Sequence, residues 1–236
     1  MPLITVLIPM RNAEPFIRAT LDSVLRQARD GVELDVVVVD DGSTDDTGRL
    51  AADAGALVVR HATNQGKAAA LTTGVLRLTE EETRQGVPPF VLLFADADLA
   101  ESAERLSPLL EPVLAGQADL AIANIPREAS SHGGGRVVRL ARGQIESLTG
   151  RRIAQPLNGM RALTREAFGW ASPLAPGWGV EAAMLVDVLR AGGRVVEVPV
   201  PLTHRATGTD LAGQVHRARQ MRDVSRALLE RRFRGG

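Results

Sequence analysis

Three apolar runs within the first hundred residues each stop abruptly at a polar turn. They are Leu3–Pro9, Leu34–Val39 and Val91–Ala95. Short continuous apolar runs are typical of strands that are buried on both faces of a mostly parallel sheet. Because parallel strands end at the same edge of a sheet, the three polar turns are expected to converge on one crevice. The pattern predicts an α/β fold with a ligand site at that edge.

Segments of helical periodicity separate these strands. Apolar residues recur at helical spacing over Phe16–Gln27, after Pro15 at a position where its missing N–H costs nothing. The acidic turn Asp40–Asp45 is expected to open the next helix, with Ser43 or Thr44 as its N-cap. Strand and helix alternate at a rhythm that predicts a Rossmann-like, parallel sheet in the first half of the chain.

The second half of the chain predicts further elements in a less regular order. Strands are expected at Ala118–Asn124 and Arg194–Val200, and helices at Glu101–Ala115, from Arg136, after the polar turn Gln155–Arg161, at Ala182–Leu189 and at Asp210–Arg234. The last of these helices is rich in arginine and amphipathic. It is expected to pack on the domain or on a partner, with a role at a membrane surface as the alternative.

Asp96 and Asp98 follow the third strand with only Ala97 between them. Two carboxylates in one tight turn can divide their work, one on a ribose hydroxyl and the other on a hard cation. Mg²⁺ and Mn²⁺ prefer oxygen ligands, and Mg²⁺ is usually held by one or two carboxylates together with substrate phosphates. Asp-x-Asp pairs also cap turns and helices, so the pair alone leaves both interpretations open.

Lys67 is the only lysine among 28 basic residues, in a turn ahead of the alanine-rich segment Ala68–Leu78. Where arginine is used everywhere else, a single lysine suggests a site that needs a compact ammonium group instead of a planar guanidinium. The alternative is that this lysine is one of many exchangeable surface cations.

Composition narrows the class of protein. A net charge of zero argues against a general nucleic-acid binder, and the absence of cysteine excludes disulfides and thiolate metal sites. No apolar run approaches the roughly 20 residues of a membrane span. The first residues enter a strand without a signal-peptide pattern, so a cytoplasmic protein is expected.

Three later segments carry further candidates. Gly133–Gly135 precede Arg136 at a helix start, an arrangement that suits a phosphate or carboxylate ligand, or that serves as a mobile linker. Glu181 stands at the start of an apolar helix, as a site carboxylate or as compensation for the helix dipole. His204 follows a strand end, where it is either a metal ligand or structural.

The order and spacing of five stretches resemble those of family 2 glycosyltransferases of the GT-A fold. They are IPMRNAE from Ile8, VVVVDDGSTDDT from Val36, NQGKAAALTTG from Asn64, FADADL from Phe94 and GWGVEAAMLVDVLRAGGRVVEVPV from Gly177. The resemblance covers residues 3–205 and implies a mixed, mostly parallel central sheet flanked by helices. It implies one domain over residues 1–207, with a nucleotide-sugar-binding half (1–100) and an acceptor-binding half (101–207), followed by the arginine-rich helix at 208–236.

The resemblance also implies roles for single residues. The implied nucleotide-binding residues are Pro9, Met10, Arg11, Asp41, Lys67, Asp96 and Ala97. Asp96 would meet the ribose, and Lys67 would reach the base or the diphosphate. Asp98 would bind the Mg²⁺ or Mn²⁺ ion that bridges the diphosphate.

Four stretches resemble glucosyl-3-phosphoglycerate synthases and related retaining enzymes more closely. They are GGGRV from Gly133, QPL with NG within 155–159, APGWGVE from Ala175 and THR from Thr203. By that likeness Gly135, Arg136 and Asn158 would hold the acceptor, and His204 would complete the metal site. Val138 departs from the pattern, because that subgroup typically has a hydroxyl residue there, and the chain also begins at the first strand, without the subgroup's N-terminal extension.

Glu181, Asp98 and Lys67 are therefore the expected catalytic residues. The metal ion and Lys67 would neutralise the charge that develops on the leaving diphosphate. Glu181 would deprotonate the acceptor if the enzyme inverts, or hold sugar hydroxyls if it retains configuration.

The expected donor is UDP-glucose and the expected acceptor a small phosphorylated or carboxylated molecule. A polyprenyl-phosphate glycosyltransferase is the neighbouring alternative, and a non-catalytic nucleotide-sugar-binding protein is another. A nucleotidyltransferase is disfavoured, because it usually needs a glycine-rich, basic turn after the first strand and Met10–Glu14 contains no glycine. The last helix would suit a homodimer contact.

Overall fold

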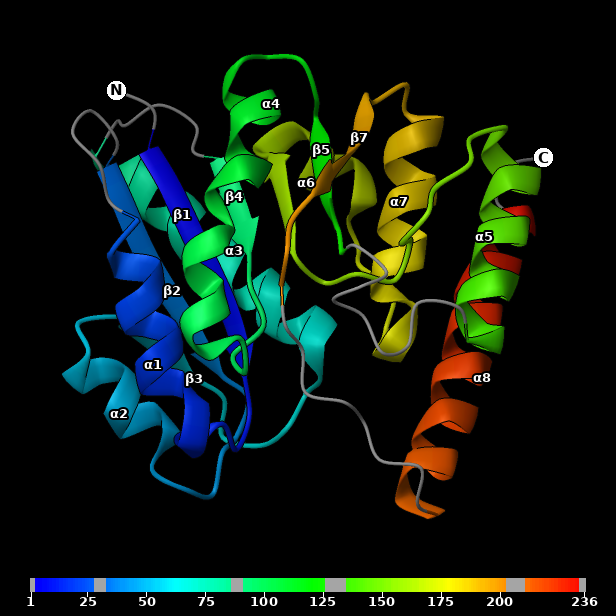
Figure 1. Cartoon of the computed structure of the whole chain (residues 1–236). Coiled ribbons are helices and arrows are strands. Elements are labelled where there is room, and N and C mark those ends of the chain that lie inside the picture. The colour runs from blue at the N-terminus through cyan, green and yellow to red at the C-terminus, as the bar shows by residue number, and fades with distance from the viewer. Residues whose placement is uncertain (1–2, 28–32, 86–90, 126–134, 203–210, 234–236) are drawn as a thin grey trace.

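A mixed β-sheet forms the centre of the protein (Figure 1). The computed structural model describes residues 3–27, 33–85, 91–125, 135–202 and 211–233. Within them the strands are β1 Leu3–Met10, β2 Glu33–Asp40, β3 Leu57–Arg60, β4 Val91–Phe94, β5 Leu120–Asn124, β6 Arg161–Thr164 and β7 Val195–Pro199. Their order in the sheet is β3-β2-β1-β4-β6-β5-β7. Helices cover both faces, so the expected α/β fold with a mostly parallel, mixed sheet is confirmed.

β6 runs against both of its neighbours. It pairs antiparallel with β4 and β5, and Arg161 is opposite Phe94 on one side and Ile122 on the other. The start of β6 therefore lies at the edge where β4 and β5 end. The expectation of a helix directly after Gln155–Arg161 was wrong, because this four-residue strand comes before the helix α6 Arg165–Ala171. A run of four residues that is largely buried shows no periodicity from which a strand can be recognised.

One face of the sheet is covered by α1 and by the segment that follows β4. The helices on this face are α1 Glu14–Leu25, α2 Thr47–Asp53, the 3₁₀ turns η1 Ala100–Arg105 and η2 Ser107–Leu109, and α4 Leu110–Leu114. Ile4, Val6 and Ile8 of β1 pack there against apolar residues of α1 and η2. The continuous helix expected at Glu101–Ala115 is broken into three pieces. Prolines at 108 and 112 lack the N–H that a continuous helix would need there.

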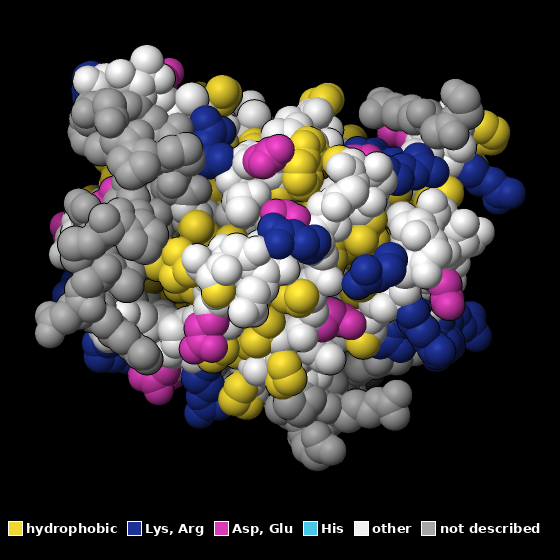
Figure 2. Space-filling model, turned by 90° about the horizontal axis from the view of Figure 1, so that it is seen from above, with side chains coloured by type: hydrophobic (Ala, Val, Ile, Leu, Met, Phe, Trp, Pro, Cys, Tyr) yellow, Lys and Arg dark blue, Asp and Glu magenta, His cyan; other side chains and the backbone are white. Residues whose placement is uncertain are grey.

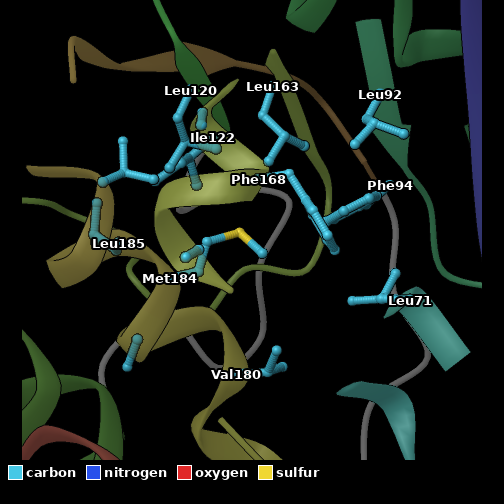
Figure 3. Packing of buried hydrophobic residues seen from close by; sticks show 14 of the residues in the cluster. Leu71, Leu92, Phe94, Leu120, Ile122, Leu163, Phe168, Val180, Met184 and Leu185 are labelled. Carbon is cyan, nitrogen blue, oxygen red and sulfur yellow. The ribbon is translucent and has the colours of Figure 1, made fainter. Parts of the chain in front are cut away.

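The other face carries the larger set of helices. These are α3 Lys67–Gln85, α5 Arg136–Thr149, α6, α7 Val180–Arg190 after the 3₁₀ turn η4 Gly177–Gly179, and α8 Leu211–Phe233. In Figure 3, Phe168 of α6 lies between Phe94 of β4 and Met184 of α7. The Phe94 and Phe168 rings meet edge to face, with 6.3 Å between their centroids. Aromatic pairs favour this geometry, which fixes α6 against β4.

The arginine-rich helix α8 packs on its own chain, beside α5 and α7 (Figure 1). Val224 and Leu228 are fully buried, and the buried guanidinium of Arg231 contacts the Asp187 carboxylate of α7 at 2.7 Å. The expectation that this helix packs on the domain is thus confirmed. No helix in the described part of the chain is both long and apolar enough for a transmembrane segment.

The surface at the amino ends of the parallel strands mixes acidic and basic side chains (Figure 2). Basic side chains gather on the side where α5 and α8 lie. The carboxyl ends of the parallel strands lie at the opposite edge, which holds the candidate site.

Candidate functional site

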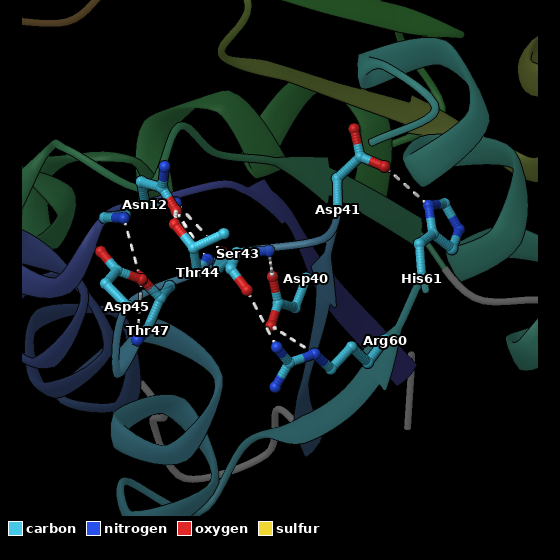
Figure 4. A network of polar contacts seen from close by, with 10 residues as sticks. Asn12, Asp40, Asp41, Ser43, Thr44, Asp45, Thr47, Arg60 and His61 are labelled. Carbon is cyan, nitrogen blue, oxygen red and sulfur yellow. Dashed lines mark hydrogen bonds and ion pairs between the residues drawn. The ribbon is translucent and has the colours of Figure 1, made fainter. Parts of the chain in front are cut away.

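The turns after β1 and β2 are locked together by side-chain bonds (Figure 4). Asn12 has a positive φ of 50°, its backbone N–H donates to Ser43 Oγ at 3.0 Å, and its Oδ1 accepts from the Thr44 backbone N–H at 3.0 Å. The Ala13 N–H donates to Thr47 Oγ1 at 2.8 Å. The expectation that Ser43 or Thr44 caps the next helix was therefore wrong. Their polar groups bond to Asn12 instead, and α2 begins only at Thr47.

The first candidate nucleotide-binding residues lie at the end of β1. Pro9 and Met10 are still within the strand, opposite Val39 and Asp40 of β2, and the Met10 side chain is buried in the core. Arg11, the next residue, is exposed at the edge of the sheet. The Met10 side chain contributes packing, Pro9 is partly exposed, and nucleotide binding by Pro9, Met10 and Arg11 remains a prediction.

Asp41 organises the turn ahead of α3. Its carboxylate accepts hydrogen bonds from the backbone N–H groups of Gln65 and Gly66, each at 2.7 Å, and contacts His61 Nδ1 at 2.8 Å. Burial alone would raise the pKa of Asp41, but these hydrogen bonds together hold it below its ordinary value. His61 in turn contacts Thr73 Oγ1 of α3 at 3.0 Å. Asp41 thereby fixes the loop that delivers Lys67.

Lys67, Asp96 and Glu181 form the centre of the candidate site. Lys67 Nζ lies 3.0 Å from Asp96 Oδ1 and 2.9 Å from Glu181 Oε1. Burial acts to lower the pKa of Lys67, but attraction to the two carboxylates outweighs it and raises that pKa above its usual value. Lys67 begins α3, Asp96 follows β4 and Glu181 is in the first turn of α7. The structure thus brings together three sequence-predicted residues from distant segments.

The loop before β6 forms a wall beside this ion triad, meaning Lys67, Asp96 and Glu181. A Cβ added to Gly159 would lie 2.7 Å from Lys67 Nζ and 3.1 Å from both Asp96 carboxylate oxygens. A side chain at position 159 would therefore displace Lys67 or Asp96, and glycine leaves that space open. Sequence analysis had not singled out Gly159 for such a contact.

Arg161, the first residue of β6, was also missed. Its side chain is 1% exposed, and its guanidinium donates to the backbone carbonyls of Asn158 (2.8 Å), Pro156 (2.7 Å) and Glu181 (2.9 Å). Burial lowers the pKa of Arg161 to about 10, against the attraction of the Glu181 charge. In a chain with many arginines, nothing in the sequence marks this one as buried.

The loop before β6 is also tied to the neighbouring strands. The Glu197 carboxylate of β7 accepts from the backbone N–H groups of Ala154 (2.9 Å) and Gln155 (2.8 Å). The side chain of Asn158 donates to the Ala123 carbonyl at 2.8 Å and accepts from the Met160 N–H at 3.0 Å. Asn158, an expected acceptor ligand, thus uses its side chain to shape the loop, and its role toward an acceptor remains a prediction.

The turn that carries the two aspartates is held by α1. Thr20 Oγ1 donates to the Ala97 carbonyl and accepts from the Ala100 N–H, both at 2.9 Å. Ala97 is buried while Asp98 is exposed, so the turn sends the Asp98 carboxylate to solvent at the sheet edge. Thr20 is a supporting residue that sequence analysis did not identify.

The carboxylates at this turn suit Mg²⁺ or Mn²⁺. Both ions prefer oxygen ligands, and Asp98 offers an exposed carboxylate two residues from Asp96. Among the described residues no cluster of three His, Asp or Glu side chains could hold an ion alone. Besides Asp98, a divalent ion here could take ligands from a diphosphate, from water or from a residue outside the described part of the chain. The expected ligand His204 lies outside the described residues.

The expected acceptor loop is described only at its end. Gly135 and Arg136 are exposed at the start of α5, whereas Gly133 and Gly134 lie outside the described residues. α5 reaches the site through Arg142, whose Nε donates to the Ala154 carbonyl. The structure therefore connects α5 to the loop before β6, and acceptor binding by Gly135 and Arg136 remains a prediction.

Comparison with known proteins agrees with this geometry. A family model described as Glycosyl transferase family 2 matches residues 5–189. Over 205 residues the chain is 30% identical to glucosyl-3-phosphoglycerate synthase of Mycobacterium tuberculosis, covering 78% of this chain and 60% of that protein. Over 200 residues it is 31% identical to glycosyltransferase AglJ of Haloferax volcanii, covering 81% of this chain and 61% of that protein. The chain thus spans about 60% of the length of these relatives.

Solved structures show the same fold. The M. tuberculosis glucosyl-3-phosphoglycerate synthase in complex with Mn²⁺, UDP and glucosyl-3-phosphoglycerate aligns with a TM-score of 0.77 and 28% identity, covering 98% of this chain and 80% of that one. A complex of the same enzyme with Mg²⁺ and UDP aligns with a TM-score of 0.76 and 28% identity. The alignment covers 98% of this chain and 79% of that one. The expected GT-A fold is confirmed. The family model matches most of the chain, residues 5–189, and the candidate site lies at the expected edge of the sheet. The chain therefore belongs to glycosyl transferase family 2.

Proposed function

We propose that this protein is a metal-dependent glycosyltransferase. It moves a sugar, expected to be glucose, from a UDP-linked donor to a small acceptor that bears a phosphate or carboxylate. The observation that carries the proposal is the ion triad, in which Lys67 and Asp96 of the nucleotide-binding half meet Glu181 of the other half within 3.0 Å. A sugar diphosphate that bridges the two halves would lie across this point.

Lys67 and the aspartates would act on the donor. The Lys67 ammonium is a compact positive charge whose hydrogen bonds can pass from carboxylates to diphosphate oxygens as the donor enters. Asp98 would hold Mg²⁺ or Mn²⁺, and the bound ion would supply electrostatic neutralisation of the leaving diphosphate. Asp96 would be released from Lys67 to accept a hydrogen bond from the ribose.

Glu181 would act on the sugar or on the acceptor. Its side chain is 11% exposed, compared with 28% for Lys67, and it contacts the Lys67 ammonium from α7. In an inverting reaction its carboxylate would take the proton of the acceptor hydroxyl as the new glycosidic bond forms. In a retaining reaction it would hold sugar hydroxyls, and the leaving diphosphate would accept the proton.

The solved relatives support the choice of donor and acceptor. Complexes of the M. tuberculosis enzyme contain Mn²⁺, UDP-glucose and phosphoglyceric acid. In this chain Asp41 and the backbone of Gln65 and Gly66 would lie near the base, with Arg11 beside them. Arg136 at the exposed start of α5 would bind the anionic group of the acceptor.

Calorimetric titration with UDP, GDP and ADP, each with and without Mn²⁺, tests the donor. We expect UDP to bind selectively, and more tightly with the metal ion than without it. Asp98→Asn should abolish the metal-dependent part, whereas Glu101→Gln, which changes an exposed carboxylate of η1, should leave it unchanged. Equal affinity of wild type and Asp98→Asn for UDP with Mn²⁺ would refute the metal assignment.

Transfer assays separate the remaining alternatives. UDP-glucose is offered with 3-phosphoglycerate or with a polyprenyl phosphate, and the glycosylated product is detected by mass spectrometry. Product on 3-phosphoglycerate supports the proposal, and product on the lipid alone identifies a polyprenyl-phosphate glycosyltransferase. If UDP binds tightly, but UDP-glucose is neither hydrolysed nor used for transfer to either acceptor, the protein is a nucleotide-sugar-binding protein.

A further inference from the structure

We propose that Arg161 is a positioning residue, which sets Glu181 and the loop 156–159 at their working distance from Lys67. The inference rests on the proposed function and deepens it, because it explains how the two halves of the site are held in register. Arg161 donates to the backbone carbonyls of Pro156, Asn158 and Glu181. It therefore acts through the backbone of the segments that approach Lys67.

The hydrogen bonds of Arg161 join two segments that are far apart in the sequence. Pro156 and Asn158 precede β6, whereas Glu181 is in the first turn of α7, and all three offer backbone carbonyls to one guanidinium. Glu181 and Gly159 both approach Lys67 from the second half of the chain. A single planar group thus fixes both parts relative to each other.

The place of Arg161 in the sheet connects this group to the first half. Arg161 is opposite Phe94 in the β4–β6 ladder, and Asp96 follows two residues later. A shift of the loop or of α7 relative to β4 would therefore strain the hydrogen bonds of Arg161. The ladder, the guanidinium and the ion triad form one continuous set of contacts across the centre of the sheet.

Charge and shape both favour an arginine at this place. Lys67 and Arg161 carry two positive charges beside the two negative charges of Asp96 and Glu181, so the cluster balances. A buried charge is costly unless it is paired and hydrogen-bonded, and three carbonyl acceptors meet that need here. A lysine would keep the charge but could not direct donors from Nε and both terminal nitrogens in one plane.

Two variants test the proposal. Arg161→Lys keeps the charge, and Arg161→Met keeps much of the volume without it. The matched control is Arg231→Met, because Arg231 is also buried and contacts the same helix α7, through Asp187. Thermal melting, UDP affinity with Mn²⁺ and transfer kinetics are measured for each protein.

We expect both Arg161 variants to bind UDP with Mn²⁺ within about threefold of wild type, because Asp96, Asp98 and the backbone that supports them are not substituted. Their kcat should fall by about a hundredfold, the size of loss that follows from a misplacement of about 1 Å at a reacting centre. Arg231→Met should lower the melting temperature but leave kcat within threefold of wild type. This difference between kcat and stability is not expected of a purely structural residue.

The single lysine gives a second readout that needs no turnover. An acetylating reagent modifies Lys67 as the sole side-chain amine, and mass spectrometry of its peptide gives the rate. An ammonium held by two carboxylates reacts slowly. The rate should rise several-fold in both Arg161 variants, because Glu181 is displaced, and should stay unchanged in Arg231→Met.

The outcomes separate the two proposals. Wild-type acetylation rates in both Arg161 variants, or a normal kcat in Arg161→Lys, would overturn the positioning role. Failure of both variants to fold would also overturn it, since Arg161 would then be a core residue only. If wild type transfers no sugar, the proposed function fails, while a faster acetylation of Lys67 in the variants still supports the role of Arg161.

Discussion

Gly159 shows how closely the backbone of one half of the molecule approaches the charges of the other. At this position a methyl group would lie 2.7 Å from Lys67 Nζ. Lys67 and Asp96 are side-chain ends that can move, so the fold tolerates the methyl group but the ion triad does not. The effect of a substitution should therefore appear in binding and catalysis rather than in stability.

Gly159→Ala is expected to weaken metal-dependent UDP binding and to lower kcat by about tenfold or more, as displacement of a catalytic group does. Its melting temperature should stay within a few degrees of wild type. Gly143→Ala in α5 is the control, because nothing lies within 4 Å of the added Cβ. The control should gain about 0.5–1 kcal/mol of stability with unchanged activity. Equal kinetics of the two variants would contradict the close approach.

Asp41 gives stability that depends on pH. Its pKa is lower in the folded protein than the ordinary value of 3.8, so the carboxylate stabilises the fold above about pH 4. This contribution is lost as the pH falls through the folded pKa. Asp41→Asn should therefore cost about 1.5–3 kcal/mol at pH 7, and the difference from wild type should shrink below pH 4.

Urea unfolding of both proteins between pH 3 and pH 7 measures this difference. The control is Asp22→Asn, which changes an exposed carboxylate ion-paired with Arg18 and should stay within about 0.5 kcal/mol of wild type. A difference between wild type and Asp41→Asn that does not vary with pH would mean that the Asp41 charge does not stabilise the loop.

Sequence analysis predicted part of the site, residue by residue. The unusual single lysine and the Asp-x-Asp turn identified Lys67 and Asp96, and the structure places them with Glu181. Arg161 and Gly159 were not found, because their importance comes from burial and close approach. Such properties depend on which distant segments meet, and local sequence does not contain that information.

At the scale of elements, α1 supports the turn after β4 through one hydroxyl. Thr20 bonds to both Ala97 and Ala100, and Ala100 has a positive φ of 47°, which is unusual for a residue other than glycine. A helix that covers one face of the sheet thus determines the path of the chain on either side of Asp98.

Thr20→Val, which replaces the hydroxyl by a methyl group, should cost about 1–3 kcal/mol because the buried Ala97 carbonyl and the part-buried Ala100 N–H lose their partner. It should also weaken UDP binding with Mn²⁺ more than binding without the ion. Thr20→Ser retains the hydroxyl and should recover most of the metal dependence. Unaltered metal-dependent binding by Thr20→Val in calorimetry would exclude this support.

Elements with a clear apolar pattern were predicted well, whereas β6 and the segment 100–114 were not. α1, β1 and β2 agree with expectation to within a few residues, because their apolar spacing and the start at Pro15 are clear. The strand β6 was missed, and the three short helical pieces within 100–114 were predicted as one continuous helix. Four residues do not show a period, and the prolines at 108 and 112 were not given their helix-breaking weight.

For the whole molecule, the alternation of strands and helices predicted the Rossmann-like half and the edge that holds the site. It did not predict the strand order, because apolar periodicity gives neither the direction of a strand nor its neighbours. The boundary between halves at residue 100 also remains a prediction. The sheet is continuous across it through the β4–β6 ladder, so we expect both halves to unfold together.

Unfolding in urea followed by two probes tests this expectation. Tryptophan fluorescence reports only the second half, through Trp170 in α6 and Trp178 in η4, whereas far-ultraviolet circular dichroism reports helices throughout the chain. The two transitions should coincide within error, as they do in a cooperative unit. A separate, later or earlier fluorescence transition would show that the halves are independent.

The reversed strand β6 has a consequence for synthesis. β4 lies in the middle of the sheet, but the strand that covers its free edge is made about 70 residues later, from Arg161. Until then the nascent chain presents the backbone of Val91–Phe94 as an open, apolar edge, which is the kind of surface that recruits other chains. We therefore expect the nascent chain to be more prone to aggregation before residue 164 is made than after it.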